Sequence, residues 1–123
     1  MFEICVISDF SAAHNLRGYQ GKCEALHGHN WTVELVVAAR SLDQAGMVLD
    51  FKHVRESIKK VLDLLDHKYL NDVMYFKKAN PTSENIAKFI FRKIKDQRLH
   101  RRVRILSVKV WETANSCAVY REN

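Results

Sequence analysis

Apolar and polar residues alternate at both ends of the chain and follow a helical period in the middle. Residues 2–9 and 29–39 predict strands, because side chains two positions apart in a strand share one face. In the second segment this face carries Trp31, Val33, Leu35 and Val37. Residues 103–112 and 116–121 alternate in the same way and predict two more strands. Residues 10–28 follow neither period and are expected to be irregular.

Apolar residues recur every three or four positions in the middle of the chain, which predicts two helices. Asp50 is the expected N-cap of the first helix. Its apolar stripe consists of Phe51, Val54, Ile58, Val61, Leu62 and Leu65. The second helix should begin near the sequence Pro81-Thr82-Ser83-Glu84, since Ser or Thr followed by an early acid is typical of a helix N-terminus. Its stripe consists of Ile86, Phe89, Ile90 and Ile94.

The expected order β-β-α-α-β-β predicts an α+β fold, with two helices on one face of an antiparallel sheet. A length of 123 residues favours one domain, spanning residues 1–123. The outer strands of such a sheet leave exposed edges. Pairing with other copies of the chain would cover these edges, so we expect a homo-oligomer.

Composition narrows the setting in which the protein works. No apolar run approaches the roughly 20 residues needed to cross a bilayer, so no membrane partner is expected. The N-terminus lacks a basic region followed by an apolar core, and no secretory signal is predicted. Three cysteines, an odd number, favour free thiols in a reducing compartment. The expected localisation is therefore cytoplasmic.

The net charge of +6 suits an anionic ligand, either nucleic acid or a phosphorylated small molecule. The densest basic segment, residues 98–104, has no interleaved aromatic residues and no nucleic-acid-binding motif. We therefore expect this segment to be a solvated loop between a helix and a strand.

Three histidines are candidate metal ligands. His27 and His29 lie two positions apart at the start of the second strand, so both imidazoles can reach one ion. His14 is expected in the loop after the first strand, near the other two if the strands pair. Three neutral histidines with an open fourth position are typical of catalytic zinc. Cys23 could instead close a structural site as a fourth ligand, or be a small buried residue.

Two further groups have both a chemical and a structural interpretation. Asp66 and His67 could form a proton relay, but a histidine is also favoured at a helix C-terminus. Glu112 continues the row of Val108 and Val110 and can point into a pocket, or it can be a solvated strand end.

Several segments together resemble the 6-pyruvoyl-tetrahydropterin synthase family, from about Phe10 to Glu112. The matching segments, in order, are Phe10-Ser11-Ala12-Ala13-His14, Cys23-Glu24-Ala25-Leu26-His27-Gly28-His29-Asn30-Trp31, Met47-Val48-Leu49-Asp50-Phe51, Leu65-Asp66-His67-Lys68-Tyr69-Leu70-Asn71, Pro81-Thr82-Ser83-Glu84-Asn85-Ile86-Ala87 and Trp111-Glu112-Thr113. The combination is specific, although no single element is. The resemblance implies the tunnelling fold, in which strands of several subunits form a barrel, usually in a hexamer of two trimers.

The three residues between Cys23 and His27 resemble the bacterial 6-carboxy-tetrahydropterin synthases of the queuosine pathway. These lyases convert dihydroneopterin triphosphate to 6-carboxy-tetrahydropterin, acetaldehyde and triphosphate. Animal 6-pyruvoyl-tetrahydropterin synthases have a longer spacing, and their reaction is an alternative. Glu24 resembles the glutamate of a folate-pathway branch, which cleaves the same substrate to 6-hydroxymethyl-dihydropterin. A chain with both residues resembles members thought to perform both reactions.

The resemblance also implies a role for each candidate residue. Zinc is bound by His14, His27 and His29. Catalysis involves Cys23, Asp66, His67 and Glu112. The pterin is bound by Glu112, with Thr82, Ser83 and Glu24 as further substrate-binding candidates. A remote alternative is a nucleic-acid-binding protein with a structural zinc site, but it leaves Asp66, His67 and Glu112 without a role. We therefore expect a small-molecule substrate and no nucleic-acid partner.

Overall fold

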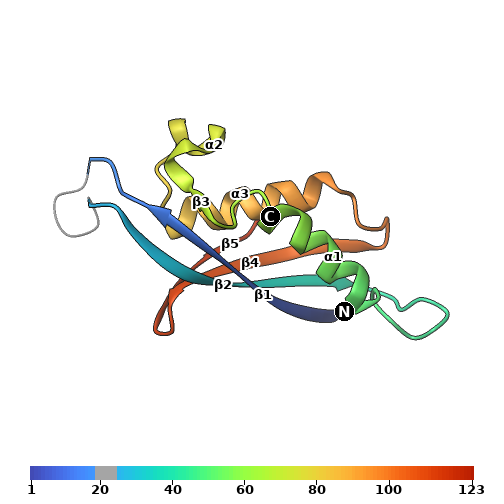
Figure 1. Cartoon of the computed structure of the whole chain (residues 1–123). Helices are drawn as coiled ribbons and strands as arrows, with labels where there is room; N and C mark the ends of the chain where they lie inside the picture. Colours follow the sequence, from blue (N-terminus) through green and yellow to red (C-terminus); the bar gives the residue numbers. More distant parts are fainter. Residues whose placement is uncertain (19–24) are drawn as a thin grey trace.

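The computed structural model describes residues 1–18 and 25–123. Figure 1 shows a twisted sheet with the helices packed on one side of it. The elements of the described residues are, in order, β1 (Phe2–His14), β2 (His27–Ala39), α1 (Phe51–Leu62), β3 (Lys68–Tyr69), the 3-10 helix η2 (Leu70–Asp72), α2 (Met74–Lys78), α3 (Ser83–Asp96), β4 (Val103–Thr113) and β5 (Ser116–Tyr120). The strand order is β3-β1-β2-β4-β5. The predicted α+β class and one-sided helix layer are therefore confirmed.

The hydrophobic core lies between the sheet and the helices. The predicted apolar face of β2 is fully buried at Trp31, Val33, Leu35 and Val37, as are Val108 and Val110 of β4. The predicted caps are also present: the Asp50 side chain accepts from the Lys52 N–H, and Thr82 accepts from the Asn85 N–H. No helix in the described part of the chain is long and apolar enough to span a membrane.

Strand β1 is longer than the alternation predicted. It pairs with β2 along its whole length, from Phe2 opposite Ala39 to His14 opposite His27. The prediction that His14 lies in a loop after the strand was therefore wrong, because backbone pairing continues beyond the regular apolar alternation. The strand pairings β1–β2, β2–β4 and β4–β5 are antiparallel, as expected.

Two short elements were not predicted. Strand β3 adds a parallel pairing to the C-terminal end of β1, with Lys68 opposite Ala12 and Tyr69 opposite Ala13. Helix α2 has only five residues, too few for a helical period to be recognised in the sequence. Both belong to the connection that leads from α1 to α3 across the end of β1 (Figure 1).

The basic segment of residues 98–104 forms the connection from α3 into β4, and most of it is exposed, as predicted. Within this segment, the Arg102 guanidinium donates to the Ser41 carbonyl at 3.1 Å and so contacts the loop that follows β2. The segment lies where Ala39 pairs with Val103, at the end of the sheet opposite His14 and His27.

Candidate metal centre

The three predicted histidine ligands meet at one end of the sheet. His14 ends β1, and it lies directly opposite His27, the first residue of β2. His29 follows two positions later and shares a face with His27 and Trp31. The imidazoles of His14 and His29 both stand edge-on to the Trp31 ring, with centroid distances of 5.0 and 5.1 Å. The face of β2 that carries the buried apolar residues therefore also carries His27 and His29.

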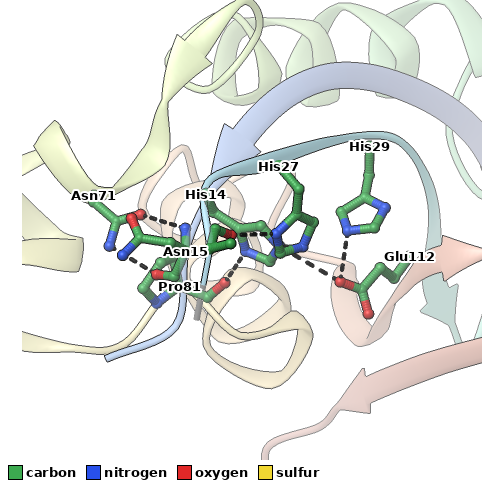
Figure 2. A network of polar contacts seen from close by, with 8 residues as sticks. His14, Asn15, His27, His29, Asn71, Pro81 and Glu112 are labelled. Carbon is green, nitrogen blue, oxygen red and sulfur yellow. Dashed lines mark hydrogen bonds and ion pairs between the residues drawn. The ribbon is translucent and has the colours of Figure 1, made fainter. Parts of the chain in front are cut away.

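The ring nitrogens of these histidines approach one another closely (Figure 2). The Nε2 atoms of His14 and His27 are 3.0 Å apart. Glu112, near the end of β4, places its Oε1 atom 3.0 Å from His29 Nε2 and 3.5 Å from His14 Nε2. One ligand atom from each of the four residues lies within 4.8 Å of every other. This spacing is suited to a single ion.

Backbone carbonyls fix the tautomers of two of the rings. Nδ1 of His14 is 2.7 Å from the Pro81 carbonyl, and Nδ1 of His27 is 2.7 Å from the Ala25 carbonyl. A carbonyl only accepts, so each Nδ1 carries the proton and each neutral ring presents a lone pair at Nε2. Two lone pairs 3.0 Å apart repel each other unless a cation or a proton lies between them. The donor set therefore fits a bound metal ion.

Burial favours the neutral form of His14 and of His29. His14 is buried, with 1% of its surface exposed, and burial lowers its pKa below the ordinary value despite the Pro81 hydrogen bond. Burial also lowers the pKa of His29, against the opposing effect of the Glu112 carboxylate. His29 Nε2 is buried, and although Glu112 Oε1 lies 3.0 Å away, the two atoms do not have the geometry of a hydrogen bond. Neutral imidazoles with free lone pairs are the form that binds zinc.

The structure brings Glu112 into this group, where the sequence predicted a pterin-binding side chain. Its carboxylate is about one-third exposed, so it can contact both a metal ion and a bound molecule. The sequence signal for its position was the period of two from Val108 through Val110. The signal did not reveal the histidine contacts, because they depend on the register between β2 and β4.

Asp66 and His67 lie next to each other beside β1. The Asp66 Oδ1 atom accepts from the Ser11 N–H at 2.9 Å and lies 3.1 Å from His67 Nδ1. The Ser11 hydrogen bond is the main reason that the pKa of Asp66 is below its ordinary value. Two adjacent residues within one helix could not easily make this contact. In the structure both follow α1, and His67 has a φ of 57°, which turns its ring back onto Asp66.

The remaining predicted residues have different surroundings. His67 and His29 line one surface hollow of about 510 Å³, although no hydrogen bond or ion pair between described residues joins Asp66 and His67 to the histidine cluster. Thr82 caps α3, and Ser83 is its first residue. Cys23 and Glu24 lie outside the described residues. The carbonyls of Pro81 and Ala25 were not predicted, because every residue has a carbonyl and sequence does not show where it points.

Comparisons with known proteins agree with this fold. A model of the 6-pyruvoyl tetrahydropterin synthase family matches residues 3–123. A 6-carboxy-5,6,7,8-tetrahydropterin synthase from Haemophilus influenzae is 33% identical over 145 residues, which cover 99% of this chain and 100% of the relative. The enzyme of the same name from Synechocystis sp. is 39% identical over 119 residues, with 90% and 86% covered.

Solved structures of the same family have a similar fold. Caenorhabditis elegans 6-pyruvoyl tetrahydropterin synthase superposes with a TM-score of 0.86 at 28% identity, covering 99% of this chain and 96% of that one. The chain belongs to the 6-pyruvoyl tetrahydropterin synthase family. It is therefore a lyase of pterin metabolism with the tunnelling fold, as the sequence predicted.

Proposed function

We propose that this chain is a zinc-dependent 6-carboxy-5,6,7,8-tetrahydropterin synthase of the queuosine pathway. Its substrate is 7,8-dihydroneopterin triphosphate, and its products are 6-carboxy-tetrahydropterin, acetaldehyde and triphosphate. The observation that carries the proposal is the convergence of His14, His27 and His29 on one point. Relatives of that name at 33% and 39% identity support the choice of reaction.

The residues divide the work between metal binding and proton transfer. His14, His27 and His29 hold the ion, which when bound supplies Lewis-acid polarisation of the oxygens on the substrate side chain. Cys23, as a thiolate, removes a proton from that side chain. A free thiol has a pKa of about 8.5, so the thiolate requires nearby positive charge.

Asp66 and His67 form the second proton-transfer group. The Asp66 carboxylate is held by the Ser11 N–H and accepts from His67 Nδ1, so the neutral ring presents its Nε2 lone pair outward. A base oriented in this way can take a proton and later return it.

Substrate binding is assigned to residues around the histidines. Glu112 accepts from the N–H groups of the pterin, and its partial exposure beside His29 leaves an oxygen free for this contact. Thr82, Ser83 and Glu24 are further candidates for the pterin pocket.

We further propose that the enzyme is an oligomer, that it is cytoplasmic and that each chain forms one domain over residues 1–123. Strand β3 covers only Ala12 and Ala13 of β1, and β5 has a single partner strand among the described elements. Apolar side chains on these edge strands are exposed, including Ile7 at 59% and Val119 at 38%. Pairing of β1 with β5 of another copy would bury them and close a barrel, usually as a hexamer of two trimers. A monomeric mass by light scattering would contradict this.

The test of the reaction is the identity of its products. Zinc-loaded protein is incubated with 7,8-dihydroneopterin triphosphate, and the pterins are identified by mass spectrometry. The expected main product is 6-carboxy-tetrahydropterin. Cys23→Ala should abolish it while zinc stays bound, whereas Cys117→Ala, which removes an exposed thiol of β5, should not. Unchanged turnover in Cys23→Ala would contradict the role of the thiolate.

A second candidate reaction is the folate-type cleavage to 6-hydroxymethyl-dihydropterin, which the adjacent Glu24 favours. In this case the 6-hydroxymethyl product should dominate and should disappear in Glu24→Gln. If 6-pyruvoyl-tetrahydropterin accumulates instead, both cleavage reactions are excluded as the main activity.

A further inference from the structure

Two asparagines hold the backbone that immediately follows the candidate ligand His14. The Asn71 side chain accepts from the Asn15 N–H at 3.0 Å and donates to the Asn15 carbonyl at 2.9 Å. The Asn80 side chain accepts from the Arg17 N–H at 2.9 Å and donates to the Arg17 carbonyl at 3.0 Å. Each carboxamide therefore satisfies both polar groups of one residue, as a neighbouring strand would.

These contacts begin where the pairing of β1 with β2 ends. His14 opposite His27 is the last pair of that ladder, so the backbone of Asn15 to Arg17 has no partner in β2. The half-buried backbone groups of Asn15 require such partners, whereas those of Arg17 are exposed. The two asparagines supply them from the connection between β3 and α3. The chain direction after His14 is thus set by side chains and not by the sheet.

Asn80 is itself held in place. The Asn85 side chain donates to the Asn80 carbonyl at 2.8 Å, which links Asn80 to the first turn of α3. The Arg17 guanidinium donates to the carbonyls of Phe76 and Ala79 at 2.6 and 3.2 Å. The contacts therefore join the segment after β1 to the whole stretch from α2 to α3.

The same stretch sets the orientation of the His14 ring. The residue after Asn80 is Pro81, whose carbonyl lies 2.7 Å from His14 Nδ1 (Figure 2). In Figure 2, Asn71 contacts Asn15 on one side of His14, while His27 and Glu112 lie on the other. One connection thus fixes both the backbone next to His14 and the tautomer of its ring.

We infer that Asn71 and Asn80 are positioning residues for the metal ligand His14. This rests on the metal site of the proposed function. Outer groups that fix the orientation of a ligating histidine contribute strongly to metal affinity, and their loss costs about 10- to 100-fold. Neither asparagine contacts the ion or the substrate in this assignment. They act by keeping the His14 Nε2 atom directed at the point it shares with His27.

The test measures zinc affinity by competition with a chelator in Asn71→Ala and Asn80→Ala. Gln97→Ala is the matched control, since Gln97 also donates from its amide to a distant carbonyl, that of Ser57 at 2.9 Å, at the other end of α3. Each asparagine variant should bind zinc at least about tenfold more weakly, while the control keeps wild-type affinity. The absorption spectrum of the Co²⁺-substituted protein should change in the same two variants, because it reports the ligand geometry.

If the alanine variants do not fold, Asn71→Asp and Asn80→Asp are used for the same measurements. Each keeps the acceptor oxygen and the shape but replaces the donated hydrogen bond by repulsion from a carbonyl. Zinc affinity and Co²⁺ spectrum equal to those of Gln97→Ala would overturn the inference. The product assay on the wild-type protein separates the two claims: product formation with unaffected asparagine variants overturns only the positioning role. A wild-type protein without metal affinity would overturn both.

Discussion

His67 has a left-handed φ of 57° and an exposed ring whose Nδ1 atom contacts Asp66. We predict that His67→Asn lowers kcat by about 100-fold or more, as expected for removal of a general acid–base group. Asparagine tolerates the left-handed conformation, so the substitution removes the imidazole without new backbone strain. Steady-state kinetics should show little change in KM.

The matched control is His53→Asn, which removes an exposed imidazole of α1. It should leave kcat unchanged. An unaltered kcat in His67→Asn would end the relay assignment, and Asp66 and His67 would then be a polar turn that follows α1.

Glu112 supports a second prediction, because its carboxylate lies beside the histidines and is partly exposed. Glu112→Gln keeps the shape but exchanges one acceptor for a donor, which the paired N–H groups of a pterin do not match. We expect the affinity for a substrate analogue to fall at least about tenfold, or about 1.4 kcal/mol, with zinc retained. Calorimetry with the zinc-loaded variant measures this. A wild-type affinity for the analogue would show that Glu112 does not anchor the pterin. Loss of zinc from the variant would show that Glu112 is a metal ligand.

The candidate metal ligands and catalytic residues were predicted from the sequence, but the groups that hydrogen-bond to them or to the adjacent backbone were not. A period of two brings His27 and His29 to one face, and family motifs add His14, Asp66, His67 and Glu112. The positions of the Pro81 carbonyl and of the Asn71 and Asn80 amides depend on how segments far apart in the sequence meet. No local pattern encodes such contacts, so they required the structure.

At the scale of elements, the strongly periodic segments were predicted well, since each has an apolar face long enough to fix its period. Helices α1 and α3 begin where their caps indicated. The end of β1 was missed because Ser11 and Ala13 do not mark a strand by composition, and only pairing with β2 defines it. The short β3 and α2 were missed for lack of a measurable period.

The attachment of the C-terminal residues to α3 supports a prediction about pH. Glu122 lies 2.7 Å from Lys95 Nζ and accepts from the Tyr120 hydroxyl at 2.7 Å. The hydrogen bond from Lys95 is the main reason that the Glu122 pKa falls from 4.5 to about 2. A depressed carboxyl pKa stabilises the fold above the unfolded value and loses this effect as the pH falls through the folded value. The contribution of Glu122 should therefore disappear between pH 4.5 and about 2.

Glu122→Gln should lower the unfolding temperature at pH 7 and flatten its dependence on pH within that window, measured by thermal denaturation. Glu56→Gln, which removes the charge of an exposed glutamate on α1, is the control. Parallel curves for the wild type and Glu122→Gln would contradict the ion-pair role of Glu122.

At the scale of the whole molecule, the sheet separates two regions of different chemistry. The histidine cluster lies where β1 ends and β2 begins, and the basic segment of residues 98–104 lies at the opposite end. In a single chain this segment therefore does not line the metal site. If this segment attracts the triphosphate of the proposed substrate, arginines of another copy in the proposed oligomer would have to approach the site.

Metal analysis of the purified protein tests whether His14, His27 and His29 hold a metal ion. The wild type and His53→Ala should each carry about one zinc per chain, since three histidines with an open position suit this ion. The variant with alanine at all three positions should carry none, and circular dichroism should show that it remains folded. Stoichiometric zinc in the folded triple variant would show that these histidines are not the metal ligands.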